Sequence, residues 1–92
     1  MLAVCWVYIL KCSDGSLYTG CTGDLTRRLG AHLSGKASKY TRSRLPVTLA
    51  YVEKATDRGS ALKREAQIKK LARSEKLTLC LAYEAKKEHD VR

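Results

Sequence analysis

Acidic residues are scarce in this sequence: nine Asp and Glu stand against eighteen Lys and Arg among 92 residues. The resulting net charge of +9 favours a polyanionic partner, most simply nucleic acid. A basic surface that serves only solubility is the competing explanation. DNA and RNA are both compatible with a charge of this kind.

Long hydrophobic runs, zinc-binding motifs and phosphate-binding loops are also missing. The apolar start, residues 1–10, is too short to span a membrane and has neither a basic leader nor a cleavage pattern. We therefore expect no signal peptide and no membrane association. The four cysteines form no CxxC pair and lie at no zinc-finger interval from a histidine. We expect them to pack as small hydrophobic residues in a cytoplasmic protein.

The residues that are present predict one small domain, residues 1–85, followed by a charged tail, residues 86–92, that we expect to fray. Segments rich in β-branched and aromatic residues predict three strands, at residues 4–11, 16–21 and 47–53. Helices are predicted after three N-caps, Asp24, Asp57 and Ser74, and they end near residues 35, 73 and 85. Residues 36–44 are predicted to form a basic loop. The order is therefore β-β-α-β-α-α.

The length of the loop between the first two predicted strands, around residues 13–15, decides which side chains share a face of the sheet. A two-residue turn would put Tyr8 and Tyr18 on opposite faces. A three-residue loop with Gly15 in the left-handed region would bring the two tyrosines onto one face. We favour the second register because it gathers both tyrosines beside the helix that follows.

The helix predicted after Asp24 carries Arg28 and His32 one turn apart, so both side chains lie on the same face. Its apolar stripe consists of three leucines, Leu25, Leu29 and Leu33. Hydroxyl, guanidinium and imidazole groups together suit phosphodiester chemistry, since the planar fork of Arg28 can hold two phosphate oxygens. Tyr8, Tyr18 and His32 are the candidates for proton transfer. A tyrosine with a pKa near ~10 would need a nearby cation or metal-bound water to act as a base at neutral pH.

Glu65 stands near the middle of the apolar arc of the helix predicted after Asp57. The other members of that arc are Ala61, Leu62, Ala66, Ile68 and Ala72. Burying an unpaired carboxylate costs several kcal/mol, so Glu65 needs a partner. Two explanations stay open: an internal salt bridge to Arg28 or Lys69, or a role as ligand of a divalent cation. Mg²⁺ suits a single carboxylate because it keeps several waters and takes phosphate oxygens as further ligands.

Together these residues resemble the GIY-YIG nuclease superfamily. Residues 6–10, Trp-Val-Tyr-Ile-Leu, stand where that family has its Gly-Ile-Tyr strand, and residues 18–20, Tyr-Thr-Gly, stand for its Tyr-Ile-Gly. Arg28 and His32 match the helix arginine of the family and the histidine of many members, and Glu65 falls at its metal-binding glutamate. The resemblance covers residues 4–80 and is closest to small stand-alone bacterial members.

Three features depart from the family pattern. Trp6 replaces the glycine of the first motif, and Cys21 replaces a lysine that some relatives carry. Many members also carry an asparagine near the C-terminus, whereas this chain contains no asparagine. In the absence of that lysine, His32 would have to serve in its place.

The resemblance implies an α/β (α+β) domain in which a three-stranded antiparallel sheet is flanked by helices. It also implies Mg²⁺- or Mn²⁺-dependent cleavage of the DNA backbone, with Tyr8 or Tyr18 as general base, Arg28 on the phosphate and Glu65 on the metal. We therefore predict an endonuclease that nicks or cuts structured DNA in repair or recombination, as a monomer or weak dimer. The flanking phosphates would be held by six residues of the basic loop and second helix: Lys36, Lys39, Tyr40, Arg42, Arg44 and Lys69.

Two alternatives stay open. The first is a non-catalytic nucleic-acid-binding module of the same fold, in which Arg28 and Glu65 form a buried ion pair and Tyr40 stacks on a base. The second is a domain that works only when docked on a larger repair partner. The sequence favours the enzyme because five chemical positions are all filled, namely Tyr8, Tyr18, Arg28, His32 and Glu65.

Overall fold

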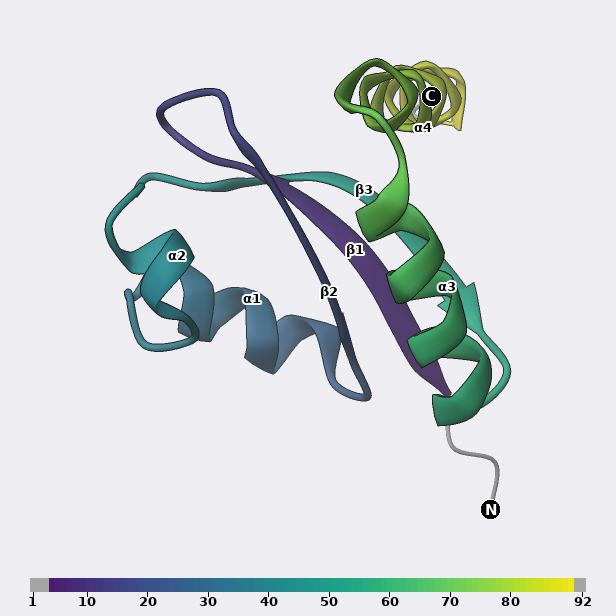
Figure 1. The fold of residues 1–92 in the computed structure, drawn as a ribbon, viewed down its shortest axis with the longest axis horizontal. Helices are drawn as coiled ribbons and strands as arrows, with labels where there is room; N and C mark the ends of the chain where they lie inside the picture. The colour runs from purple at the N-terminus through teal and green to yellow at the C-terminus, as the bar shows by residue number, and fades with distance from the viewer. Residues whose placement is uncertain (1–3, 91–92) are drawn as a thin grey trace.

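The chain forms a three-stranded antiparallel sheet with helices packed on both faces (Figure 1). The structure is a computed structural model that describes residues 4–90, with side chains described up to residue 87. The strand order is β2-β1-β3, so β1 is central and runs antiparallel to both neighbours. The elements are β1 (Cys5–Lys11), β2 (Leu17–Thr22), α1 (Leu25–Leu33), α2 (Lys39–Arg42), β3 (Thr48–Ala55), α3 (Arg58–Lys70) and α4 (Arg73–Asp90). The predicted sheet and fold class are confirmed.

Strand β1 supplies two separate cores, because successive side chains of a strand point to opposite faces of the sheet. Val7 and Ile9 are fully buried in the core that includes α3 and α4. Tyr8 and Leu10 are buried in the core on the other face, against α1. Strand β1 is covered on both faces along most of its length, so the hydroxyl of the buried Tyr8 must find its partner inside the protein.

The β1–β2 hairpin adopts the three-residue loop that we favoured. Gly15 lies in the left-handed region with φ of 84°. The N–H of Cys12 donates to the carbonyl of Ser16 over 2.9 Å, which closes the loop. Tyr8 then stands opposite Gly20, and Leu10 opposite Tyr18. Both tyrosines therefore share the face toward α1, as predicted.

Two of the predicted helix caps are confirmed. Asp24 accepts a hydrogen bond from the N–H of Arg27 at 3.1 Å, and Asp57 accepts one from the N–H of Ser60 at 2.7 Å. Helix α1 ends in a Schellman arrangement, with Gly35 at φ of 76° following the last turn.

Several predicted boundaries were wrong. Residues 36–44 contain the short helix α2, capped by Ser38. Helix α3 ends at Lys70, and α4 begins before Ser74, with Glu75 accepting a hydrogen bond from the N–H of Ala72 at 3.0 Å. Helix α4 also continues past the predicted end at residue 85, through part of the expected tail to Asp90. Residues 1–3 and 91–92 lie outside the described part of the chain.

The apolar faces of two helices are narrower than predicted. Leu33 is 60% exposed and Leu62 is 44% exposed, and Ala66 is exposed as well. Helix α3 meets the sheet through Ala61 and Ile68, which are fully buried. Glu65 lies between these two along the same stripe, which is why its side chain is mostly covered. None of the helices within residues 4–90 combines the length and the apolar character that a membrane span requires.

Gly20 is required by the packing of the Tyr8 ring. A Cβ atom at Gly20 would lie 2.6 Å from Oη and 2.8 Å from Cζ of Tyr8. The ring of Tyr8 is 1% exposed and has no free space to move into. The glycine of the second motif is thus a consequence of the buried tyrosine of the first.

We predict that Gly20→Ala lowers the free energy of unfolding by about 1–3 kcal/mol, the usual cost of overpacking a core. Urea denaturation followed by circular dichroism would measure it. Gly30→Ala is the matched control, because a Cβ there meets nothing within 4 Å. In the interior of a helix that change should raise stability by up to ~1 kcal/mol. Equal effects of the two substitutions would contradict the packing explanation.

Candidate active site

Tyr8, Tyr18, Arg28 and His32 lie together between the sheet and α1. Tyr8 Oη and His32 Nε2 are 2.9 Å apart and share a hydrogen bond. The rings of Tyr18 and His32 meet edge to face, with centroids 5.2 Å apart. Interaction with the Tyr8 hydroxyl raises the pKa of Arg28, and Tyr18 acts in the same direction. Two hydroxyls, a guanidinium and an imidazole therefore converge on one point.

His32 is fully buried, and its two ring nitrogens both have partners. Nδ1 lies 2.9 Å from Oγ1 of Thr41, which is also fully buried, and Nε2 faces Tyr8. Burial lowers the pKa of His32, and the charge of Arg28 lowers it further. A neutral imidazole has one donor and one acceptor nitrogen, so one of the two hydroxyls donates to the ring and the other accepts from it.

Thr41 is a site residue that sequence reasoning missed. It lies on α2, and its N–H donates to Oγ of Ser38, the N-cap of that helix, at 3.2 Å. The two hydroxyl oxygens are also 3.0 Å apart. A Ser followed by a Thr three residues later is a local capping pattern, and it could have indicated a helix here rather than a loop.

Tyr8 and Tyr18 differ in their access to solvent. Tyr8 is 1% exposed, and its burial raises its pKa, an effect that the hydrogen bond to Arg28 opposes. Tyr18 is only half-buried and lies beside the exposed Tyr40, with ring centroids 5.8 Å apart. Tyr18 is therefore the more exposed of the two tyrosines.

Glu65 lies on α3, across strand β2 from the tyrosines. Its Oε2 is 3.4 Å from Nζ of Lys69, and Cys21 Sγ donates to its Oε1 at 3.5 Å. Of the two salt-bridge partners considered from the sequence, the partner in the described residues is therefore Lys69 and not Arg28. Burial raises the pKa of the Cys21 thiol, and the charge of Glu65 raises it further. The contact between Cys21 and Glu65 was not predicted, and no local pattern in the sequence indicates it.

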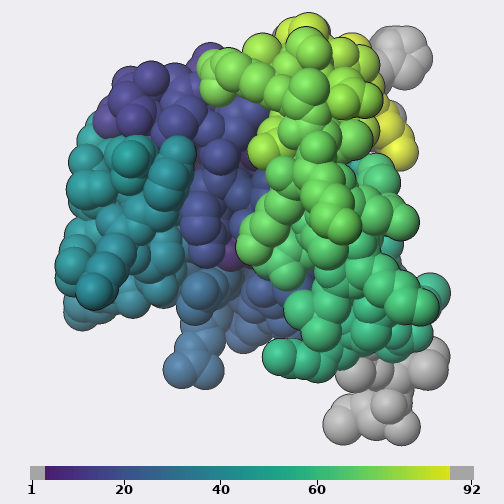
Figure 2. All heavy atoms as spheres, viewed as in Figure 1, coloured from purple at the N-terminus to yellow at the C-terminus, as the bar shows by residue number. Residues whose placement is uncertain are grey.

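Edge strand β2 lies between the two groups. Figure 1 shows β2 running between α1 and α3, and the surface in Figure 2 is hollowed between these helices. A pocket of about 520 Å³ beside this edge is lined by Arg28 and by other residues from 22 to 31. Gly20 and Cys21 are neighbours on β2 with opposite orientations, so this short segment connects the tyrosine cluster to Glu65.

The surroundings of Glu65 fit a cation whose coordination is completed by water and phosphate. Within the described side chains, no three His, Cys, Asp or Glu residues converge as a closed metal site. The side chain of Glu65 is 18% exposed and so is partly accessible from the surface. A single accessible carboxylate is compatible with Mg²⁺ or Mn²⁺ held jointly with a substrate phosphate.

The predicted nucleic-acid contacts fall into two groups. Lys36, Lys39 and Arg42 are exposed and surround a small hollow of about 170 Å³. Arg44 instead pairs with Asp14 at 3.0 Å and covers the ring of Tyr40, with Cζ 3.8 Å from the ring centroid. The last of the six, Lys69, contacts Glu65. Of the six, the first three therefore offer accessible positive charge on this side of the molecule.

Comparison with known proteins identifies the family. The family model of the GIY-YIG catalytic domain matches residues 4–78, which include every predicted catalytic residue. The chain belongs to the GIY-YIG family. The UPF0213 protein of Syntrophus aciditrophicus is 55% identical over 75 residues, which cover 80% of this chain and 86% of that protein. A UPF0213 protein of Clostridium perfringens is 49% identical over 84 residues, which cover 91% and 90%.

A relative of known structure has the same fold. The solution NMR structure of the UPF0213 protein BH0048 from Bacillus halodurans is 43% identical, with a TM-score of 0.54. The match covers 83% of this chain and 81% of that protein. These matches confirm the resemblance to small stand-alone GIY-YIG proteins.

The buried imidazole predicts a pH dependence of stability. Burial lowers the pKa of folded His32 below its ordinary value of 6.5, so the unfolded chain takes up the proton more readily. The contribution of His32 to stability is then complete above about pH 6.5 and is lost as the pH falls below it. Urea denaturation across this range should show a steeper loss for the wild type than for His32→Gln. Parallel loss in both proteins would show that another group is responsible.

Proposed function

We propose that this GIY-YIG protein is a divalent-metal-dependent endonuclease that hydrolyses DNA phosphodiester bonds. The observation that carries the proposal is the hydrogen-bonded pair of Tyr8 and His32 with Arg28 beside it. A buried tyrosine needs one polar partner, but a guanidinium at the same point adds a phosphate-binding group that packing does not require. The net charge of +9 supports a nucleic-acid substrate.

In the proposed mechanism Tyr18 is the general base. Tyr18 is the more exposed of the two tyrosines, and the guanidinium of Arg28 lies beside it. Tyr8 is too deeply buried to reach the attacking water, so it acts as a positioning residue. Its O–H donates to Nε2 of His32, while Nδ1–H donates to Thr41, and this chain holds the tyrosine cluster in place.

Arg28 and Glu65 have separate roles in this proposal. Arg28 would hold the scissile phosphate and offset the charge that develops on its oxygens. Glu65 would hold Mg²⁺ or Mn²⁺, which supplies Lewis-acid activation of the phosphate and its leaving oxygen when bound. Lys36, Lys39 and Arg42 would hold flanking phosphates, with Tyr40, Arg44 and Lys69 at the margins. A single site of this kind should nick, and double-strand cleavage would need a dimer or two successive events.

We place the reaction in DNA repair or recombination in the cytoplasm, with a monomer or weak dimer as the working form. A larger repair partner would supply substrate selection if the domain is inactive alone. A non-catalytic nucleic-acid-binding module is the second candidate function. The observation that favours it is the ion pair between Glu65 and Lys69, which gives the carboxylate a structural role without metal.

Cleavage of labelled branched, flapped, single-stranded and duplex DNA in Mg²⁺, Mn²⁺ or EDTA tests the proposal. We expect cutting that depends on metal and is absent from Glu65→Gln, because the amide is a poor ligand for a hard cation. Glu65→Gln should bind DNA as the wild type does. Binding without cutting in every metal would favour the non-catalytic module. A large loss of stability in Glu65→Gln would show that the ion pair is its main role.

The two tyrosines should differ when each hydroxyl is removed. We expect Tyr18→Phe to lower the cleavage rate at saturating DNA by at least about 10²-fold, because it removes the base. Tyr8→Phe should lower it by about tenfold, the equivalent of one hydrogen bond. Thermal unfolding would check that both variants remain folded. Equal and mild effects would rule out a tyrosine base, and a larger effect at Tyr8 would reverse the assignment.

A further inference from the structure

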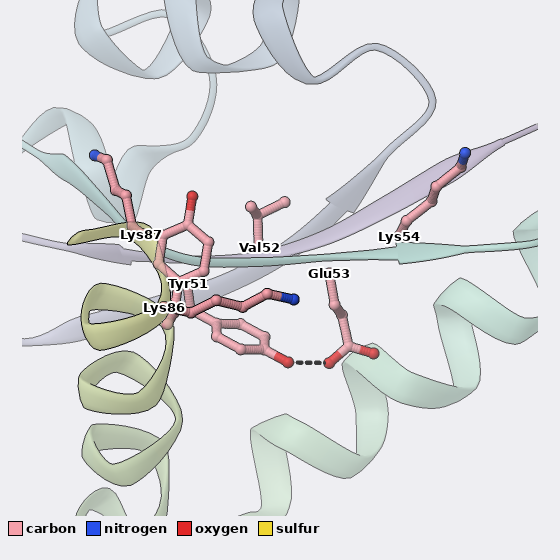
Figure 3. A pocket seen from close by; sticks show the side chains of 7 residues that line it. Tyr51, Val52, Glu53, Lys54, Lys86 and Lys87 are labelled. Carbon is pink, nitrogen blue, oxygen red and sulfur yellow. Dashed lines mark hydrogen bonds between the residues drawn. The ribbon is translucent and has the colours of Figure 1, made fainter. Parts of the chain in front are cut away.

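A second pocket lies at the opposite edge of the sheet from β2, between edge strand β3 and α4 (Figure 3). Its volume is about 610 Å³. Residues 51–54 of β3 form one wall, and Tyr83, Lys86 and Lys87 of α4 form the other. None of these residues belongs to the candidate active site, so the pocket needs an explanation of its own.

The charge of this pocket is positive. Glu53 is the acidic residue of its lining, and Nε of Arg64 donates to both its carboxylate oxygens at 3.0 and 3.1 Å. The hydroxyl of Tyr51 also donates to Glu53, as the dashed line in Figure 3 shows. With that carboxylate compensated, the ammonium groups of Lys54, Lys86 and Lys87 set the charge. Figure 3 shows Lys54 and Lys87 well apart along β3, with Lys86 between them. Lys54 projects from the same face of the strand as Val52, whereas Lys86 extends beside Tyr51 and Glu53 on the other face, so the three lysines line the edge of β3 from both sides.

The pocket also contains aromatic surface. The rings of Tyr51 and Tyr83 meet edge to face, with centroids 6.0 Å apart and planes at 70°. Both residues are only half-buried. An edge-to-face pair offers an accessible ring on which a planar group can stack. Lysines that follow a backbone and aromatic rings that accept bases are the two elements of single-strand binding sites.

Strand β3 is an open edge, so a second copy of the chain is the competing occupant. Pairing two copies along this edge would bring the lysines of both pockets together between molecules that each carry a net charge of +9. A polyanion has a charge complementary to the pocket, whereas a second copy of the chain has a charge of the same sign. The observations therefore favour nucleic acid.

We propose that this pocket binds an unpaired segment of nucleic acid, with phosphates on Lys54, Lys86 and Lys87 and a base against Tyr83. The proposal rests on the proposed function only for the role of that segment, which would be the single-stranded arm of a DNA whose scissile phosphate lies beside Arg28. The molecule measures 37 × 31 × 30 Å, so one branched or flapped DNA can reach both edges of the sheet.

Binding of a fluorescent oligothymidylate in EDTA, measured across a salt series, tests the pocket without any cleavage. We expect Lys54→Gln/Lys86→Gln to bind more weakly and to lower the slope of log K against log salt by about 1.4, since each single-strand phosphate contact contributes about 0.7. Lys11→Gln/Lys76→Gln is the matched control, because it removes the same charge outside both sites. It should leave the slope unchanged.

Tyr83 gives an independent measurement. Tyr83→Leu should weaken binding about tenfold with no change in salt slope, because stacking involves no ions, and Tyr83→Phe should restore it. The proposal is overturned if the lysine pair behaves like its control. It is also overturned if sedimentation shows a dimer that the Lys54→Gln/Lys86→Gln change alters and the oligonucleotide does not, because a second copy would then occupy this edge. If the wild type binds the oligonucleotide as expected but cuts no DNA, the proposed nuclease activity is refuted and this pocket is not. If the wild type cuts DNA and the Lys54→Gln/Lys86→Gln variant binds with unchanged affinity and salt slope, this pocket is refuted and the nuclease activity is not.

Discussion

The hydrogen bond between Tyr8 and His32 is the interaction on which the site depends. A central strand covered on both faces gives the phenol no access to water, so its hydroxyl must be satisfied internally. His32 is the hydrogen-bond partner of that hydroxyl, and its second ring nitrogen needs a partner in turn, which is Thr41. The amide of Thr41 donates to Ser38. One buried polar group thus connects β1, α1 and α2. In such a network each bond supports the next, and removal of one partner leaves the others unsatisfied.

The same network explains why the basic segment is positioned rather than free. Thr41 fixes α2 against His32, and Tyr40 beside it then lies against Tyr18 and under Arg44. A helix of one turn has little stability of its own, so these contacts and the Ser38 cap must hold it. The charges proposed to hold flanking phosphates are therefore carried on a support that also orients the imidazole. Phosphate contact and proton transfer would share one structural element.

Local signals in the sequence were sufficient for the parts of this fold that local physics decides. Gly15 in the left-handed region selected the hairpin register, and Asp24 and Asp57 marked the starts of α1 and α3. The contacts that were not predicted join residues of different elements, such as Cys21 with Glu65 or His32 with Thr41. Their spacing has no periodicity, because it depends on how helices pack against the sheet. Exposure of Leu62 has the same origin, since packing and not hydropathy decides the width of a buried face.

Glu65 can have a structural role in the free protein and a chemical role once substrate binds. In the free protein its contact with Lys69 compensates the charge of the carboxylate, but Lys69 is 57% exposed, so water screens the attraction between them. Such a partner can be displaced at little cost. A DNA phosphate that approaches this edge would be repelled by an uncompensated carboxylate, and a divalent cation shared by both removes the repulsion. In the proposed mechanism, metal and substrate would therefore bind here with positive coupling, and Lys69 would be released towards the phosphate backbone.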